Sequence, residues 1–138
     1  MSVSENIAIS NKIDELEKVS FFLEEFCEAN EIPMKIANSF QIVLDELISN
    51  TIFYGFKKSA KGKIEIYFSY ENNNLTALLI DNGKKYDPHN APAPDILNND
   101  VENKKIGGLG IHIVKKMMDT FVYERKDDKN YITISKHF

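Results

Sequence analysis

Two residue types are scarce in this chain. Cys27 is the single cysteine in 138 residues, so no internal disulfide can form, which suits a reducing compartment. Arg125 is the single arginine among 17 basic residues. Because arginine supplies the bidentate fork for phosphate and carboxylate groups, any phosphate binding must depend on lysines, backbone N–H groups or a metal.

The sequence also lacks the marks of membrane and nucleic-acid-binding proteins. No apolar run approaches the roughly 18 residues of a membrane span, and no basic-then-apolar leader opens the chain. The net charge of −4 argues against nucleic acid or an anionic membrane as the main partner. We therefore expect a cytoplasmic protein with neither kind of partner.

What is present is ordinary for a globular protein, with 43% hydrophobic and 28% charged residues. We expect one domain over residues 1–138, long enough to bury roughly two-thirds of its unfolded surface. Cys27 lies in "FFLEEFCEAN", where a small core residue is favoured over a nucleophile.

Hydrophobic periodicity predicts five strands and three helices in the order β-α-α-β-β-α-β-β, with a long loop before the third helix. The expected elements are an edge strand in "VSENIAIS", helices over about 12–29 and 33–56, strands over 63–70 and 75–81, a helix over about 108–118, and two closing strands joined at 127–130. This order favours an α+β fold, a two-layer sandwich with the helices on one face of a mixed, mainly antiparallel sheet.

A long loop separates the two halves of the sheet. Residues 82–107 hold three of the four prolines, and a short helical turn is expected near 93–98. A compact domain rarely keeps such a loop without a function, so residues of about 84–107 are expected to form a lid or binding segment.

Glu46 and Asn50 interrupt the apolar pattern of the second helix, in "DELISNTIFYGF". Their spacing of four residues places them one above the other at the edge of the buried stripe. A carboxylate that loses solvent becomes a better proton acceptor, and a neutral amide oxygen suits a hard cation. The alternative is a solvated glutamate beside a locally bonded amide.

Asp81 ends a buried strand and is followed by Asn82 and Gly83. One interpretation is an Asx-turn in which the glycine supplies an unusual dihedral angle. The other is a ligand site, since a carboxylate beside a small residue can accept a hydrogen bond from a ligand's amino group.

Glycines open the helix that follows the long loop, in "KKIGGLGIHIV". Free N–H groups and the helix dipole at such a start attract anions. Alone the pattern is a weak signal, and the strand-loop-helix order differs from Rossmann and P-loop sites. The sequence contains no cluster of histidines that would indicate a metal centre.

Together these three segments resemble the motifs of the histidine-kinase-type ATPases, the GHKL superfamily. "DELISNTIFYGF" resembles the N box, "DNGKKYDP" the first glycine box and "GGLGIHIVKKMMD" the second. The resemblance covers about residues 36–135.

Within the superfamily the chain resembles the small anti-sigma factor/serine-protein kinases. The short length and the "D-x-G-x-x-Tyr-Asp-Pro" form of the first glycine box indicate this group. Lys85 stands where histidine kinases usually have a second glycine, and all three histidines lie at 89 or later, so a complete sensor kinase is not expected.

The resemblance implies a role for each matching residue. Glu46 would be the general base and Asn50 the Mg²⁺ ligand, while Asp81 would bind the adenine amino group and Gly83 would make room for the base. The remaining ATP-binding residues would be Lys105, Gly107, Gly108, Leu109 and Gly110 at the phosphates, and Thr133 as an adenine-side hydroxyl.

The resemblance also implies an ATP- and Mg²⁺-dependent protein serine/threonine kinase. Its substrate would be an anti-sigma-factor antagonist, it would also sequester a sigma factor, and it could form a homodimer through the sheet or first helix. Two alternatives remain open, namely a nucleotide-dependent partner-binding module without kinase activity and a stand-alone ATPase whose Glu46 activates water.

Overall fold

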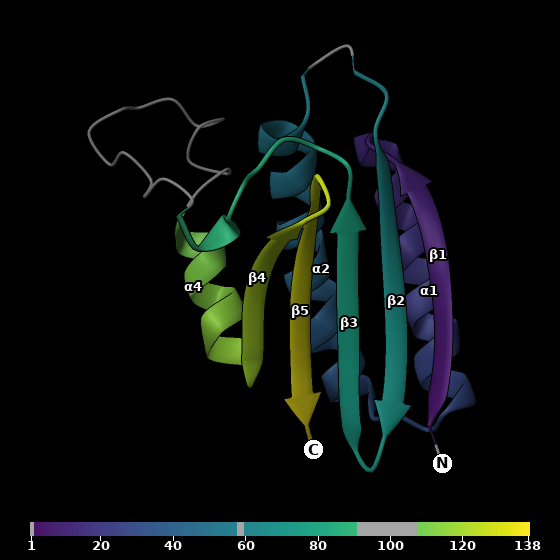
Figure 1. Ribbon diagram of the computed structural model, residues 1–138. Helices are drawn as coiled ribbons and strands as arrows, with labels where there is room; N and C mark the ends of the chain where they lie inside the picture. The colour runs from purple at the N-terminus through teal and green to yellow at the C-terminus, as the bar shows by residue number, and fades with distance from the viewer. Residues whose placement is uncertain (1, 58–59, 91–107) are drawn as a thin grey trace.

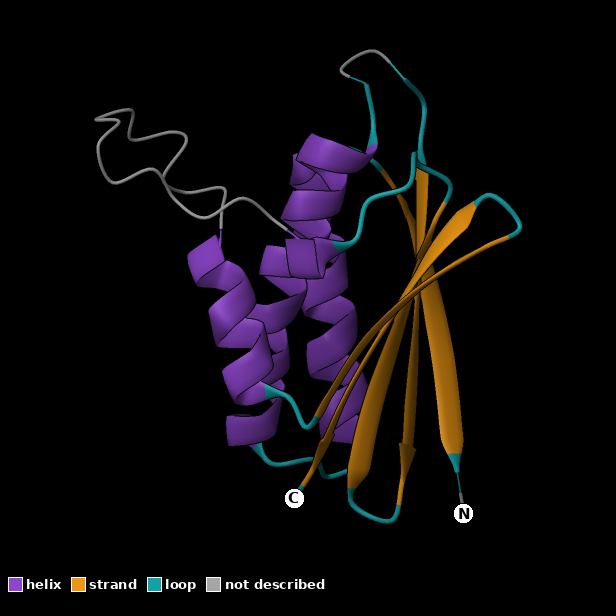
Figure 2. Cartoon of the chain, turned by 60° about the vertical axis from the view of Figure 1, so that its left-hand side comes forward, coloured by secondary structure: helices purple, strands orange, loops and turns teal. Residues whose placement is uncertain are grey.

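The computed structural model describes residues 2–57, 60–90 and 108–138. Five strands form one sheet in the order β1-β2-β3-β5-β4, and the helices cover one of its faces (Figures 1 and 2). The elements are β1 (Val3–Ser10), η1 (Ile13–Glu15), α1 (Leu16–Ala29), α2 (Met34–Gly55), β2 (Lys63–Glu71), β3 (Asn74–Asp81), η2 (Pro88–Asn90), α4 (Gly108–Met117), β4 (Thr120–Lys126) and β5 (Lys129–His137). The expected helical turn near 93–98 lies outside the described residues.

The predicted α+β class is confirmed, with one correction to the sheet. Every described pair of neighbouring strands is antiparallel, so the sheet is not mixed. The physical reason is the position of β5. In the sequence, β3 precedes α4 and β4 follows it, and in the sheet these two strands run in the same direction. They are not neighbours, because β5 lies between them and is antiparallel to both.

The helices bury the apolar stripes that the sequence predicts. α2 extends over 22 residues, and its buried side chains include Phe40, Leu44 and Leu47 at helical spacing. Cys27 of α1 is 3% exposed, and its burial raises the thiol's pKa to about 11. The core interpretation of Cys27 is confirmed. No helix in the described ranges is both long and apolar enough to cross a membrane.

Both tight hairpins use a two-residue turn with positive φ. Asn72 and Asn73 connect β2 to β3 at φ values of 50° and 61°. Asp127 and Asp128 connect β4 to β5 at 52° and 61°. Asn and Asp tolerate this region better than most side chains, and it matches the twist of the flanking strands. The second turn is shorter than the predicted 127–130, so Asn130 belongs to β5 and pairs with Asp81.

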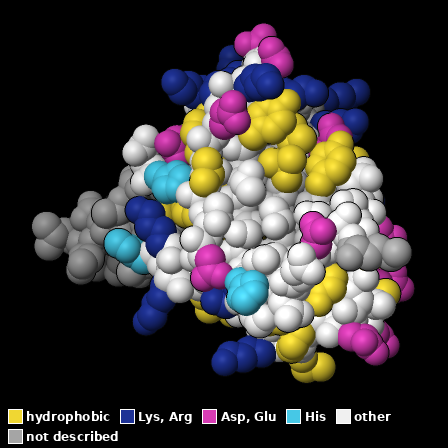
Figure 3. All heavy atoms as spheres, turned by 60° about the horizontal axis from the view of Figure 1, so that its bottom comes forward, with side chains coloured by type: hydrophobic (Ala, Val, Ile, Leu, Met, Phe, Trp, Pro, Cys, Tyr) yellow, Lys and Arg dark blue, Asp and Glu magenta, His cyan; other side chains and the backbone are white. Residues whose placement is uncertain are grey.

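The sheet face turned away from the helices carries a polar row near the end of the sheet that holds the β2–β3 turn. Hydroxyl residues lie side by side on all five strands, in the row Ser4, Ser69, Thr76, Ser135 and Thr120. In Figure 3 white atoms, which belong to the backbone and to other side chains, fill the centre of the view, and hydrophobic side chains gather above them. Tyr67 and Val122 are 37% and 53% exposed on this face.

Candidate functional site

Glu46 and Asn50 lie on one edge of α2, as their spacing predicts. Asn50 is only 2% exposed, and its Nδ2 donates a hydrogen bond to Glu46 Oε1 at 3.3 Å. This bond uses the donor end of the amide and leaves Oδ1 as an acceptor without a donor among the described residues. An amide oxygen in that setting can bind a hard cation.

The environment of Glu46 favours proton acceptance. The carboxyl group is half-buried, and the loss of solvent raises its pKa, while the hydrogen bond from Asn50 acts in the opposite direction. A carboxylate whose pKa is raised toward neutrality is a better general base.

The start of α4 lies directly on the Glu46 carboxylate. Gly110 is in contact with it, and a Cβ atom at this position would overlap Glu46 Oε1 and Cδ. Gly108 and Leu109 are the first two residues of α4. The first N–H groups of a helix have no partner within the helix. The structure therefore places the start of a helix, whose first N–H groups have no partner within the helix, beside the carboxylate on α2.

Asp81 forms the second cluster of the candidate site, at the end of β3. Its side chain is 3% exposed, and Oδ1 accepts hydrogen bonds from the Gly83 N–H and from Asn130 Nδ2, both at 2.9 Å. Burial raises the pKa of Asp81, which these bonds and the charge of Arg125 partly offset. The Asx-turn interpretation is thus observed, yet it uses only Oδ1. Oδ2 has no partner in the described part of the chain and is available to a ligand.

Gly83 is required for space and not for its dihedral angle. None of the described glycines has positive φ. A Cβ atom on Gly83 would lie 2.5 Å from the carbonyl oxygen of Gly55, the last residue of α2. The next N–H, that of Lys84, donates to the same oxygen at 2.9 Å. The loop after Asp81 is thereby fixed to the end of the helix that carries Glu46.

Asn130 is a site residue that the sequence reasoning missed. It is 1% exposed, and besides Asp81 its Nδ2 donates to the Lys84 carbonyl at 2.8 Å. Its Oδ1 accepts from the Tyr123 hydroxyl at 2.6 Å and from Arg125 Nη1 at 3.2 Å. Asn130 therefore holds the Asp81 carboxyl group in position. The available signal was a polar residue, two positions after the Asp127–Asp128 turn, at an inward position of a strand.

Arg125 binds the loop that follows Asp81. Its Nη1 donates to the Gly83 carbonyl at 2.8 Å as well as to Asn130. The single arginine of the sequence is thus engaged in holding the loop, in keeping with the expectation that phosphate binding depends on other groups.

Thr133 is not brought to this site. In β5, Asn130, Ile132 and Ile134 are buried on the helix side, so Thr133 falls on the opposite face. It pairs with Leu78, and both line a cavity on the open face of the sheet. The correction follows from the twofold alternation of a strand, because Thr133 is three positions from Asn130, an odd number.

Lys105 and Gly107 lie outside the described residues. The predicted lid of about 84–107 is described only as far as Asn90. There the Asp87 carboxylate accepts from the backbone N–H of His89 at 2.9 Å, and the His89 ring stacks on Phe121 with 3.9 Å between centroids.

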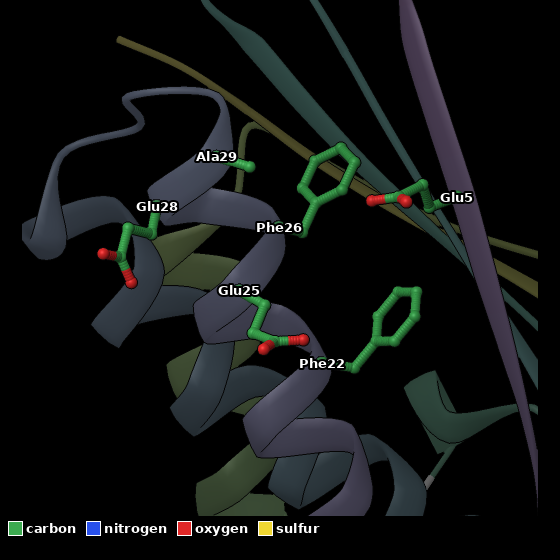
Figure 4. Close-up of a pocket in the computed structure, with 6 residues that line it drawn as sticks. All are labelled: Glu5, Phe22, Glu25, Phe26, Glu28 and Ala29. Carbon is green, nitrogen blue, oxygen red and sulfur yellow. The ribbon is translucent and has the colours of Figure 1, made fainter.

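A separate cavity of about 500 Å³ lies between α1 and β1 (Figure 4). It contains none of the predicted site residues, since its lining is Glu5, Phe22, Glu25, Phe26, Glu28 and Ala29. The candidate site is defined by the two clusters on α2 and at the end of β3.

Comparisons with known proteins identify the class to which this fold and site belong. The family model of the histidine kinase-like ATPase domain matches residues 9–136. The chain belongs to this family. Among solved structures, the histidine kinase domain of the Erythrobacter litoralis EL346 blue-light activated histidine kinase superposes with a TM-score of 0.56. The match covers 89% of this chain and 59% of that one at 15% identity, so it shows the shared fold.

Two known protein kinases are similar in sequence to this chain. The serine/threonine-protein kinase BtrW of Bordetella bronchiseptica is 22% identical over 117 residues, which are 85% of this chain and 82% of the relative. The serine-protein kinase RsbW of Listeria innocua is 28% identical over 82 residues, 57% of this chain. That match spans about half of the Listeria kinase, 52% of its length. The chain is therefore similar to serine-protein kinases within the family.

The described residues fit the ATP that the family name implies. Asp81 offers a buried carboxylate oxygen to an amino group, and Asn50 offers a neutral amide oxygen beside the Glu46 carboxylate. Mg²⁺ commonly takes only one or two protein oxygens together with substrate phosphates. In the described ranges, the candidate site included, no three His, Cys, Asp or Glu side chains are grouped to hold a metal ion.

Proposed function

We propose that this chain is an ATP- and Mg²⁺-dependent protein kinase that phosphorylates a serine or threonine of an anti-sigma-factor antagonist and also sequesters a sigma factor. The observation that carries the proposal is the Glu46–Asn50 pair beneath the start of α4. The kinase names of BtrW and RsbW support the type of reaction and the amino acid phosphorylated. ATP is a cytosolic metabolite, and we place the reaction in the cytoplasm.

The proposed chemistry assigns one task to each cluster. Asp81 Oδ2 accepts the adenine amino hydrogen bond, while Asn50 Oδ1 holds Mg²⁺. Gly108, Leu109 and Gly110 present backbone N–H groups to the phosphates, together with Lys105 and Gly107 from the preceding segment. ATP and Mg²⁺ supply the transferable phosphoryl group and neutralise its charge.

Glu46 then acts on the acceptor. As the hydroxyl oxygen of the partner forms its bond to the γ-phosphorus, the bond to the β-γ bridging oxygen breaks and ADP leaves. The hydroxyl proton passes to the Glu46 carboxylate, whose raised pKa suits this role. Arg125 is bound to Gly83 and Asn130, so it adds no charge clamp to the phosphoryl group, and a slow, regulatory rate is expected.

The test separates chemistry from binding. Glu46→Gln keeps the shape of the side chain and removes an anion near the triphosphate, so ATP affinity should hold or rise slightly. Phosphate transfer should fall by about 10²–10⁴-fold, the usual contribution of a positioned base. Asn50→Ala should lower both transfer and Mg²⁺-dependent ATP affinity, because it removes the amide oxygen from the metal.

The measurements are single-turnover transfer from γ-labelled ATP to a purified antagonist protein and calorimetric ATP binding. Glu24→Gln is the matched control, since Glu24 is an exposed glutamate of α1, far along the chain from the site. Wild-type transfer by Glu46→Gln would contradict the kinase mechanism. ATP binding without transfer by the wild type would favour the binding module, and Glu46-dependent release of phosphate to water would favour the ATPase.

A further inference from the structure

Tyr86 lies between the two clusters of the candidate site. Its backbone N–H donates to Asn130 Oδ1 at 3.4 Å, which connects it to the residue that positions Asp81. Its ring stacks on Tyr54 with centroids 5.2 Å apart and planes inclined by 10°. Tyr54 follows Asn50 by four residues on α2, about one helical turn. Tyr86 therefore extends from the adenine end of the proposed site toward the Glu46–Asn50 edge.

The hydroxyl group of Tyr86 is buried and has no hydrogen-bond partner among the described residues. Other tyrosines of the described chain are satisfied: the hydroxyl of Tyr123 donates to Asn130, and that of Tyr67 to Glu65, both at 2.6 Å. Buried polar groups in native proteins nearly always have a partner, either in the protein or in something bound to it. Tyr86 therefore requires an acceptor that the described chain does not supply.

The chemistry of the hydroxyl indicates the kind of acceptor. Burial, with the nearby Tyr54 and the Glu46 carboxylate, raises the pKa of Tyr86 to about 12. The group is a protonated donor at neutral pH and lies close enough to Glu46 to be affected by its charge. An anionic oxygen forms the strongest hydrogen bond with such a donor. Beside Glu46 and Asn50, the proposed function places the phosphate chain of the nucleotide.

We propose that the Tyr86 hydroxyl donates a hydrogen bond to a phosphate oxygen of the bound nucleotide. This inference rests on the proposed nucleotide site and adds to it a contact from the loop between Asp81 and η2. It makes Tyr86 a residue that distinguishes a nucleotide from a nucleoside. Its ring also couples the loop to α2 through Tyr54.

Tyr86→Phe tests the contact, because the ring and its stacking on Tyr54 are kept and only the hydroxyl is removed. Calorimetry should show ADP with Mg²⁺ binding about tenfold more weakly, the usual effect of losing one hydrogen bond to a charged group. Adenosine, which has no phosphate, should bind the variant and the wild type equally. The urea midpoint of the ligand-free variant should hold or rise, since it lacks a buried hydroxyl without a partner.

Tyr67→Phe is the matched control, because it removes a tyrosine hydroxyl from the open face of the sheet. It should leave ADP affinity unchanged. Equal ADP affinity of Tyr86→Phe and wild type would overturn the inference, as would an equal loss of affinity for adenosine. A lower urea midpoint with unchanged ADP affinity would place the partner within the protein and also overturn it. If the wild type binds neither ADP nor ATP with Mg²⁺, the proposed function itself fails.

Discussion

Asp81 combines a structural role with an unfavourable charge. Its Oδ1 closes the turn at Gly83 and receives Asn130, while burial raises the pKa of the carboxyl group. A neutral amide could accept the same two hydrogen bonds through its oxygen. A charged side chain at this position is therefore better explained by a ligand than by the turn.

Asp81→Asn should separate these roles. ATP affinity should fall by about 1–3 kcal/mol, because the amide oxygen keeps the two bonds of Oδ1 and the amide NH2, a donor, replaces Oδ2 as the group facing the proposed adenine amino group. The free energy of unfolding at neutral pH should hold or rise. Calorimetric titration with ATP and urea unfolding measure the two quantities, and unchanged ATP affinity would contradict the site assignment.

The site residues differ in how well a sequence can reveal them. Glu46 and Asn50 were predictable as neighbours because helical periodicity fixes the geometry of residues four apart. Asn130 and Thr133 were not distinguishable, since a shift by an odd number of residues exchanges the two faces of β5. The stack of Tyr54 on Tyr86 joins distant segments, and no local pattern indicates it.

At the scale of elements, α4 can pack closely against Glu46 of α2 because Gly110 has no side chain. Alanine in a helix is favoured over glycine by roughly 1 kcal/mol, but its Cβ atom would occupy the space of the Glu46 carboxylate. Either α4 must shift or Glu46 must leave its position.

Gly110→Ala should therefore lower phosphate transfer by about 100-fold or more, since small displacements of reacting groups have effects of that order. Gly55→Ala, at the end of α2, is the contrasting variant, for which we expect a change in the stability of the fold. Its added Cβ would meet only Thr51 Cγ2, at 3.7 Å, so it should stabilise the fold by about 0.5–1 kcal/mol. The assays are single-turnover transfer and urea unfolding. Wild-type transfer by Gly110→Ala would show that the contact is not needed.

The strands and helices themselves were largely predictable. α2 was expected over 33–56 and spans Met34–Gly55, because a long amphipathic pattern is a strong signal. The antiparallel arrangement was harder to predict, since it depends on the insertion of β5 between β3 and β4. No local pattern specifies which strands become neighbours across a long connection.

At the scale of the whole molecule, buried carboxyl groups predict how stability depends on pH. The pKa values of Asp81 and Glu46 are raised in the folded protein, so their contribution to stability is present below the unfolded pKa, about 4, and is lost as pH rises through the folded pKa. Glu15 has the opposite sign. Its pKa is lowered to about 2, chiefly by Lys18, and its contribution is lost as pH falls toward that value.

The double variant Asp81→Asn/Glu46→Gln isolates the first effect, because both replacements are neutral at all pH values. Its free energy of unfolding should exceed that of the wild type most at pH 7, and the difference should shrink as pH falls through the raised folded pKa values and be smallest below about 4. Urea unfolding at several pH values measures this difference. A difference independent of pH would show that the two carboxyl groups do not titrate as the structure indicates.

The pairing of Asp81 with Asn130 also has a consequence for the order in which the protein matures. The two residues are 49 positions apart, and the hydrogen bond between them exists only when β5 lies beside β3. Long-range strand pairing is slow, because closing a large loop reduces chain entropy before the contacts form. During synthesis, α1, α2 and the β2–β3 hairpin emerge before β5. If Asp81 binds adenine as proposed, the adenine site is completed late, and we expect a newly made chain to be insensitive to the nucleotide until β5 has paired with β3.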